Sequence, residues 1–183
     1  MASDTRSRMV EATVEALQRR GIAGMSFTEV LNSSGAARGA IYHHFPGGKT
    51  QLVAEAATRN GQDVRAGLAA LPADSPRGVV EAFLAAVRPV VLASAEGASC
   101  AVAAVSVGAD QDELRQVAAA AFDSWVEQLA QRLTSAGLDP EQAADLATTL
   151  ITLLEGAQVL CRAAGGVAPF DRAARTALAL VTH

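Results

Sequence analysis

The stretch that decides the fold runs from Ser26 to Lys49 and reads SFTEVLNSSGAARGAIYHHFPGGK. It holds the only tyrosine, Tyr42, the only lysine and two of the three histidines of the chain. Ser26 followed three residues later by Glu29 is a capping box, which predicts that a helix begins there. Gly35 supplies the left-handed backbone that a sharp turn between two helices requires. The stretch therefore predicts a helix, a tight turn and a second helix.

The second helix is expected from about Ala37 and ends before Pro46, which cannot continue it. Ile41 and Phe45 are four residues apart, share one face and are expected to pack inward. The face that turns outward then carries Arg38, Gly39, Tyr42 and His43. Arginine suits guanine, and tyrosine and histidine suit phosphates or base edges, so this short helix is predicted to enter the major groove of DNA.

Two flanking residues extend the predicted DNA-binding surface. Thr28 lies in the first turn of the first helix, where backbone amides and a hydroxyl group can hold a phosphate. Lys49 begins the next helix, where a cation opposes the helix dipole. A phosphate bound at that helix end would remove the conflict.

The run GAARGAIYHHFPGGK, followed by Leu52, resembles the signature of the TetR family of one-component transcriptional regulators. It is similar in particular to the LmrA/YxaF branch of that family. The resemblance is dense over residues 6–55 and looser beyond, through SCAVAAV and AAAAFDSW. It implies that the matching residues contact operator DNA. These are Thr28, Arg38, Gly39, Ala40, Tyr42, His43, His44 and Lys49. Ala40, where many relatives carry Ser or Thr, is expected to contact a thymine methyl group instead.

An all-α fold of about nine helices is expected. A three-helix helix-turn-helix unit, residues 1–48, precedes a larger helical domain for effector binding and dimerisation, residues 49–183. The helices outside the decisive stretch are expected over 5–20, 49–71, 75–93, 110–136, 139–164 and 171–181. Residues 99–107 fit a buried strand or a short helix by composition, and the resemblance favours the helix.

Charge and composition limit the possible partners. The net charge is −4, but residues 1–65 carry eight basic and six acidic side chains, whereas the remainder carries seven and thirteen. A polyanion is therefore expected at the N-terminal end, and the small excess of positive charge there predicts that binding requires a dimer.

No run of about 18 uncharged apolar residues occurs, so no membrane segment is expected. Cys100 and Cys161 lack metal-ligand spacing and indicate a reduced, cytoplasmic protein without metal or cofactor.

The helix over 139–164 is apolar on more than one side, which indicates that a second subunit covers part of it. The resemblance implies that the last two long helices form a four-helix bundle with a second copy. Two-fold symmetry then predicts a pseudo-palindromic operator. The residues expected at the dimer interface are Leu146, Leu150, Leu153, Ala157, Leu160, Ala174, Leu178 and Val181.

The resemblance also implies a pocket for a small apolar effector in the larger domain, whose filling moves the helix that starts at Lys49. Plain core packing is the alternative for each aromatic residue there. The residues expected to line the pocket are Phe83, Val87, Ser99, Cys100, Phe122, Trp125, Leu154 and Gln158.

Other interpretations are weaker. His43 and His44 point about 100° apart on a helix, and no third ligand is near, so they do not predict a metal site. Arg6 and Arg8 are either solvated charges or phosphate contacts. No nucleophile–histidine or paired-carboxylate pattern occurs, which argues against an enzyme.

The sequence predicts a ligand-responsive, dimeric regulator, most simply a repressor. The alternative is a helical small-molecule binding protein or enzyme that does not bind DNA.

Overall fold

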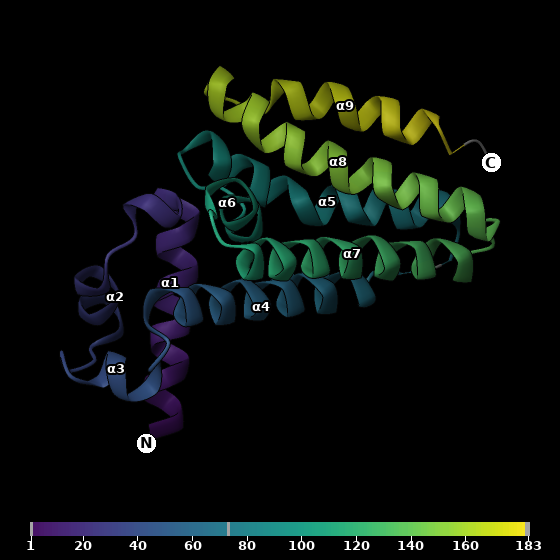
Figure 1. Cartoon of the computed structure of the whole chain (residues 1–183). Helices are drawn as coiled ribbons and strands as arrows, with labels where there is room; N and C mark the ends of the chain where they lie inside the picture. The colour runs from purple at the N-terminus through teal and green to yellow at the C-terminus, as the bar shows by residue number, and fades with distance from the viewer. Residues whose placement is uncertain (1, 73, 182–183) are drawn as a thin grey trace. The chain divides into compact units, whose positions relative to one another are not determined.

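A computed structural model describes residues 2–72 and 74–181, and every regular element in this part of the chain is an α-helix (Figure 1). The predicted all-α class is confirmed. The helices of the described residues are α1 (Ala2–Gly24), α2 (Phe27–Ser34), α3 (Ala40–His44), α4 (Gly48–Ala69), α5 (Pro76–Ala95), α6 (Ala101–Gly108), α7 (Asp112–Ser135), α8 (Pro140–Ala164) and α9 (Ala168–Ala179).

The predicted helix signals at α1 and α2 act largely as expected. The Ser26 hydroxyl oxygen accepts a hydrogen bond from the Glu29 amide at 3.2 Å, which caps α2. The carboxylate of Glu29 pairs with Arg20 at the end of α1, at 3.1 Å. Gly35 closes α2 in the left-handed conformation, with φ of 65°, and Gly21 interrupts α1 with φ of 63°. The helix-turn-helix is therefore fixed by a cap and by two glycines that tolerate positive φ.

Several helix starts differ from the sequence prediction, and α1 begins at Ala2, three residues earlier than expected. The α3 helix begins at Ala40, because the preceding residues form a turn in which the Ala40 amide bonds to the Ala37 carbonyl at 2.9 Å. The α7 helix begins at Asp112, two residues later than expected. The α9 helix begins three residues earlier, at Ala168, because Pro169 lies in its first turn, where a missing amide proton costs nothing.

The described residues divide into two compact units. The first comprises residues up to 62 together with 99–122, and the second comprises 63–98 together with 123 onward. The α4 and α7 helices each run through both units. In the first unit, α1 packs against α2 and α6, and the Ser99 hydroxyl donates to the Gln18 carbonyl at 2.8 Å. A segment far along the sequence thus belongs to the same unit as the helix-turn-helix.

The α4 and α7 helices approach closely within the first unit at Gly61. A Cβ atom built on Gly61 would lie 2.9 Å from the Cβ atom of Ala121. Real Cβ atoms do not come that close, so the absence of a side chain at Gly61 permits this helix contact.

In the second unit α5, α8 and α9 lie side by side (Figure 1). The core of this unit includes Phe83, Phe170 and Trp125 of α7, each no more than 2% exposed. A buried polar pair joins α5 to α8: the Ser94 hydroxyl lies 3.1 Å from the side-chain oxygen of Gln158. Such a pair is satisfied only in one register of the two helices, so it fixes their alignment.

The α5 and α8 helices are each long and apolar enough to cross a membrane by length and composition alone, with 39% of the apolar window buried inside the chain. Core helices of ordinary proteins pass the same test, so this is weak evidence for a membrane segment. Here the two helices pack against each other and against α9.

Candidate DNA-binding surface

The α3 helix presents one buried and one exposed face, as its sequence predicts. Ile41 is 2% exposed and Phe45 is fully buried, so both anchor the helix in the first unit. Tyr42, between them in sequence, is 66% exposed. Burial of this pair therefore turns the tyrosine and its polar neighbours toward solvent.

A groove of about 290 Å³ separates α2 from α3, and we call it the α2–α3 groove. It is lined by Phe27, Thr28, Leu31, Asn32, Arg38, Ile41 and Tyr42. Three residues of the predicted DNA-binding set thus surround one concave surface, with Thr28 from the first turn of α2 and the other two from the second half of the motif. This places two donors and one guanidinium group around a single depression.

Tyr42 is held in place by an aromatic contact. Its ring meets that of Phe27 edge to face, with centroids 6.0 Å apart and planes at 87°. Edge-to-face pairs of this kind are favourable because the positive ring edge meets the negative ring face. The contact fixes the ring while leaving most of the side chain in solvent.

The remaining predicted contacts lie along α3. His43 is exposed and His44 half-buried, with their rings 5.1 Å apart and inclined at 71°. Gly39 is exposed, and a Cβ atom there would meet nothing within 4 Å, so its backbone is open to a binding partner. Ala40 is half-buried at the start of the helix. Among the described residues no group of three His, Cys, Asp or Glu side chains gathers that could hold a metal ion.

Asn32 belongs to the same groove and was missed by the sequence analysis. It is exposed and lines the groove beside Thr28. The spacing of four residues between Thr28 and Asn32 puts them on one helix face, and this spacing was the available sequence signal. An amide side chain at this position adds a donor and an acceptor suited to adenine.

Lys49 has a different environment from the one expected. Its ammonium group donates to the carbonyl oxygens of Ile22 and Met25, at 2.7 and 3.0 Å. These carbonyls lie at the end of α1, where helix carbonyls carry partial negative charge. The unfavourable position of the cation at the start of α4 is therefore compensated within the chain, and no phosphate is needed to explain it.

Arg6 and Arg8 also have partners within the chain. Arg6 forms an ion pair with Glu55 of α4, and its guanidinium carbon lies 5.1 Å from the centroid of the Phe45 ring. Arg8 lies 3.7 Å from the Asp4 carboxylate and donates to the Thr5 hydroxyl at 3.2 Å. Neither guanidinium group is simply a solvated charge.

The predicted effector-pocket residues fall into both units. Ser99, Cys100 and Phe122 belong to the first unit and are half-buried, and the Cys100 sulfur caps α6 by accepting from the Ala103 amide at 3.4 Å. The other five are buried in the second unit: Phe83, Val87, Trp125, Leu154 and Gln158. The structure thus gathers five of the eight residues in one unit and gives Ser99 and Cys100 structural partners in the other.

The predicted dimer residues are likewise divided by burial. Leu150, Ala157 and Val181 are buried inside the single chain, because α8 and α9 pack against α5, and their side chains are already covered. Leu160 is 59% exposed. Leu146, Leu153, Ala174 and Leu178 are half-buried. Only these last five leave surface for a second subunit.

Comparison with known proteins identifies the class to which this architecture belongs. Residues 9–56 match the family described as bacterial regulatory proteins, tetR family. Residues 76–176 match the C-terminal domain of LmrA/YxaF-like transcriptional regulators. The first match spans the helix-turn-helix and the start of α4, and the second spans α5 to α9 in large part.

Relatives and solved structures agree with these matches. An uncharacterized HTH-type transcriptional regulator of Mycobacterium tuberculosis is 37% identical over 91% of this chain and 88% of its own length. The HTH-type transcriptional regulator LmrA of Bacillus subtilis is 25% identical over 91% of this chain and 90% of its own length. A TetR-family regulator from Agrobacterium tumefaciens has the same fold, with a TM-score of 0.83, 22% identity and full coverage of both chains.

The chain therefore belongs to the TetR family of transcriptional regulators, with an LmrA/YxaF-like C-terminal domain. The family resemblance predicted from the GAARGAIYHHFPGGK run is confirmed.

Proposed function

We propose that this regulator is a homodimeric repressor that blocks a promoter by occupying a pseudo-palindromic operator. Each copy inserts α3 into the major groove, with Arg38, Tyr42 and His43 toward the bases and phosphates. Thr28 and Asn32 hold the backbone or a base edge beside it. Gly39, Ala40 and His44 complete the contact surface, and residues 1–48 form the reading unit.

The observation that carries this proposal is the convergence of Thr28, Arg38 and Tyr42 on the α2–α3 groove. Buried anchors on the opposite face of α3 hold this surface outward. Acceptors and donors on DNA phosphates and base edges match these side chains. The net charge of the whole chain is negative, so contact is limited to this positively charged end.

Fluorescence anisotropy over a salt series tests the proposal. The probe is a duplex selected from a random pool by the wild-type protein, with a scrambled duplex of equal composition as control. We expect preferential binding of the selected duplex and a linear fall of log affinity with log salt concentration. Failure to enrich any duplex at low salt would reject DNA binding and favour the small-molecule binding alternative.

The dimer in this proposal uses the exposed face of α8. Thr149, Thr152, Gly156 and Leu160 are exposed, and Val159 beside them is 68% exposed. A glycine inside a helix costs about 1 kcal/mol relative to alanine. A Cβ atom on Gly156 would meet nothing within 4 Å in the single chain, so no contact inside the chain requires a glycine there. Close approach of α8 from a second copy explains why a glycine stands at this position.

The effector in this proposal is a small apolar molecule bound in the second unit, among Phe83, Val87, Trp125 and Leu154. Gln158 supplies a polar anchor by exchanging its hydrogen bond with Ser94 for one to the effector. These side chains are buried, so entry requires α5 and α8 to separate. The effector acts by binding a dimer state unfit for DNA more tightly than the DNA-binding state.

A screen of apolar compounds tests this part, with release of the selected duplex as the readout. Compounds that release DNA are expected to lose potency in Gln158→Leu, which keeps the volume and removes the anchor. Equal potency in the wild type and in Gln158→Leu would remove Gln158 from the site.

We propose further that the protein acts by binding, without catalysis, in the cytoplasm.

A further inference from the structure

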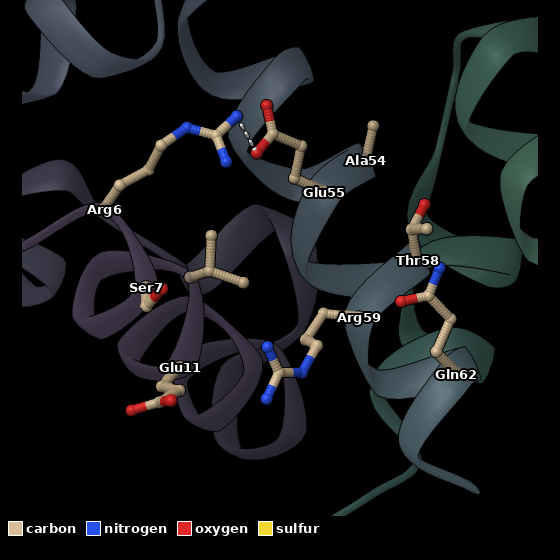
Figure 2. A pocket seen from close by; sticks show the side chains of 9 residues that line it. Arg6, Ser7, Glu11, Ala54, Glu55, Thr58, Arg59 and Gln62 are labelled. Carbon is tan, nitrogen blue, oxygen red and sulfur yellow. Dashed lines mark ion pairs between the residues drawn. The ribbon is translucent and has the colours of Figure 1, made fainter. Parts of the chain in front are cut away.

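Arg6 joins three elements of the first unit. It belongs to α1, pairs with Glu55 of α4, and lies over the ring of Phe45, the residue that ends α3. Figure 2 shows the Arg6 side chain reaching across from α1 toward the Glu55 carboxylate. A cation over an aromatic face is attracted by the ring quadrupole, so Arg6 contacts both the helix that reads DNA and the helix that follows it.

Hydrogen bonds continue from Glu55 to the turn after α3. The other Glu55 oxygen, Oε1, accepts from the Gln51 side-chain amide at 3.0 Å. The Gln51 oxygen accepts from the Gly47 backbone amide at 2.9 Å. Gly47 lies in the turn between α3 and α4. We call this set, Arg6, Phe45, Gly47, Gln51 and Glu55, the Arg6 junction.

The junction is only partly shielded from solvent. The Arg6 and Glu55 side chains are 45% and 26% exposed, and a cavity of about 320 Å³ opens beside them between α1 and α4 (Figure 2). Ion pairs with this exposure contribute little to global stability. Their effect is expected on the geometry of the turn rather than on the free energy of unfolding.

The Glu55 carboxylate also neutralises much of the positive charge of Arg6. The Glu55 carboxylate is in direct contact with the guanidinium group, so an approaching phosphate would meet a neutral pair. The Arg6 N–H groups that do not face Glu55 could reach a phosphate only against repulsion from this carboxylate. These contacts therefore favour an internal role over a DNA contact.

We infer that Arg6 is a positioning residue, which acts with Glu55 and Gln51 to hold the end of α3 against α1 and α4. The inference rests on the proposed function, since α3 is taken as the helix that reads DNA. The consequence is that Glu55, an anion near a DNA-binding surface, supports DNA binding instead of opposing it.

The inference and its alternative predict opposite changes in DNA affinity for the substitution Glu55→Gln. If Arg6 holds α3 through Glu55, then Glu55→Gln weakens binding of the selected duplex roughly twofold to fivefold, the range of a partly exposed pair. If Arg6 contacts a phosphate, the same change frees the arginine and removes a repelling charge, so binding strengthens. Glu81→Gln is the matched control, because it removes the partner of Arg77 from an exposed pair in α5.

The salt dependence gives a second distinction. Arg6→Gln is expected to weaken binding by a similar factor while leaving the slope of log affinity against log salt unchanged. Loss of a phosphate contact would lower that slope by about one. The double variant, Arg6→Gln with Glu55→Gln, is expected to bind no worse than the weaker single variant, because both changes break the same junction.

Amide hydrogen exchange tests the junction without DNA and so separates its failure from that of the proposed function. Exchange of the Gly47 amide is expected to quicken about threefold to tenfold in both single variants, with the unfolding midpoint within about 3 °C of wild type. Glu81→Gln is expected to leave it unchanged. Wild-type protection of Gly47 in both variants, or tighter DNA binding in Glu55→Gln, would overturn the inference.

Discussion

The ammonium group of Lys49 lies 2.7 Å from the carbonyl oxygen of Ile22, twenty-seven residues earlier in the chain. A second bond, to the Met25 carbonyl at 3.0 Å, makes the lysine a clamp between the start of α4 and the end of α1. Because a charged donor bonded to partly buried carbonyls contributes about 1–2 kcal/mol, Lys49→Met is expected to lower the free energy of unfolding by about that amount. Urea denaturation measures it.

The same variant separates a clamp from a phosphate contact. A clamp lowers stability, whereas a phosphate contact lowers DNA affinity and the salt slope at unchanged stability. Full stability of Lys49→Met, with a slope reduced by about one, would return Lys49 to the DNA-contact set.

Tyr42 is the sharpest single test of the DNA-binding surface. Tyr42→Ala is expected to reduce affinity for the selected duplex roughly tenfold or more, since a hydroxyl bonded to a charged phosphate is a strong contact. The cost in stability is expected to stay below about 1 kcal/mol, because the side chain is 66% exposed. Tyr42→Phe keeps the ring contact with Phe27 and isolates the hydroxyl group. Val107→Ala, at another exposed position of the first unit, is the control.

Gly156 tests the proposed dimer. Gly156→Leu is expected to convert the dimer to a folded monomer, because the new side chain has open space in the single chain but blocks the approach of a second α8. Sedimentation velocity measures the change in mass, and circular dichroism shows whether helix content is kept. Gly67→Leu is the control, since Gly67 is also an exposed glycine inside a helix with nothing within 4 Å. A dimer that persists in Gly156→Leu would place the interface elsewhere.

Gly61 is expected to respond in the opposite direction from other helix glycines. Replacing a helix glycine by alanine normally stabilises by up to about 1 kcal/mol, and Gly67→Ala is expected to do so. Gly61→Ala is expected to lower the free energy of unfolding by about 1–2 kcal/mol, because its new Cβ would overlap that of Ala121. Adding Ala121→Gly to Gly61→Ala is expected to recover part of the loss. Thermal unfolding of the three variants measures how much this helix contact depends on the glycine.

The local chemistry of the chain predicted most of the fold. Ser26 and Gly35 mark helix ends through a cap and a left-handed glycine, and the structure has them in those roles. The start of α3 was placed too early, because alanines fit both a turn and a first helical turn. Such residues carry no side-chain group that distinguishes the two conformations.

The environment of the charged residues could not be predicted in the same way. Lys49 and Arg6 find partners 24 to 49 residues away in sequence, and such contacts leave no periodic pattern. A basic residue near a helix-turn-helix fits a phosphate contact and an internal clamp equally well from sequence alone. The position of Asn32 could have been predicted, because it lies four residues after Thr28 on the same helix face. The burial of Leu150 could not, because it depends on which helices pack against α8.

The bond between Ser99 and Gln18 bears on how such regulators can be cut and recombined. A gene fragment ending near residue 62 would encode the helix-turn-helix without α6, which packs against α1. The apolar side of α1 would then face water in the fragment. We therefore expect that a chimera carrying the helix-turn-helix of this regulator folds properly only if it also carries residues 99–122.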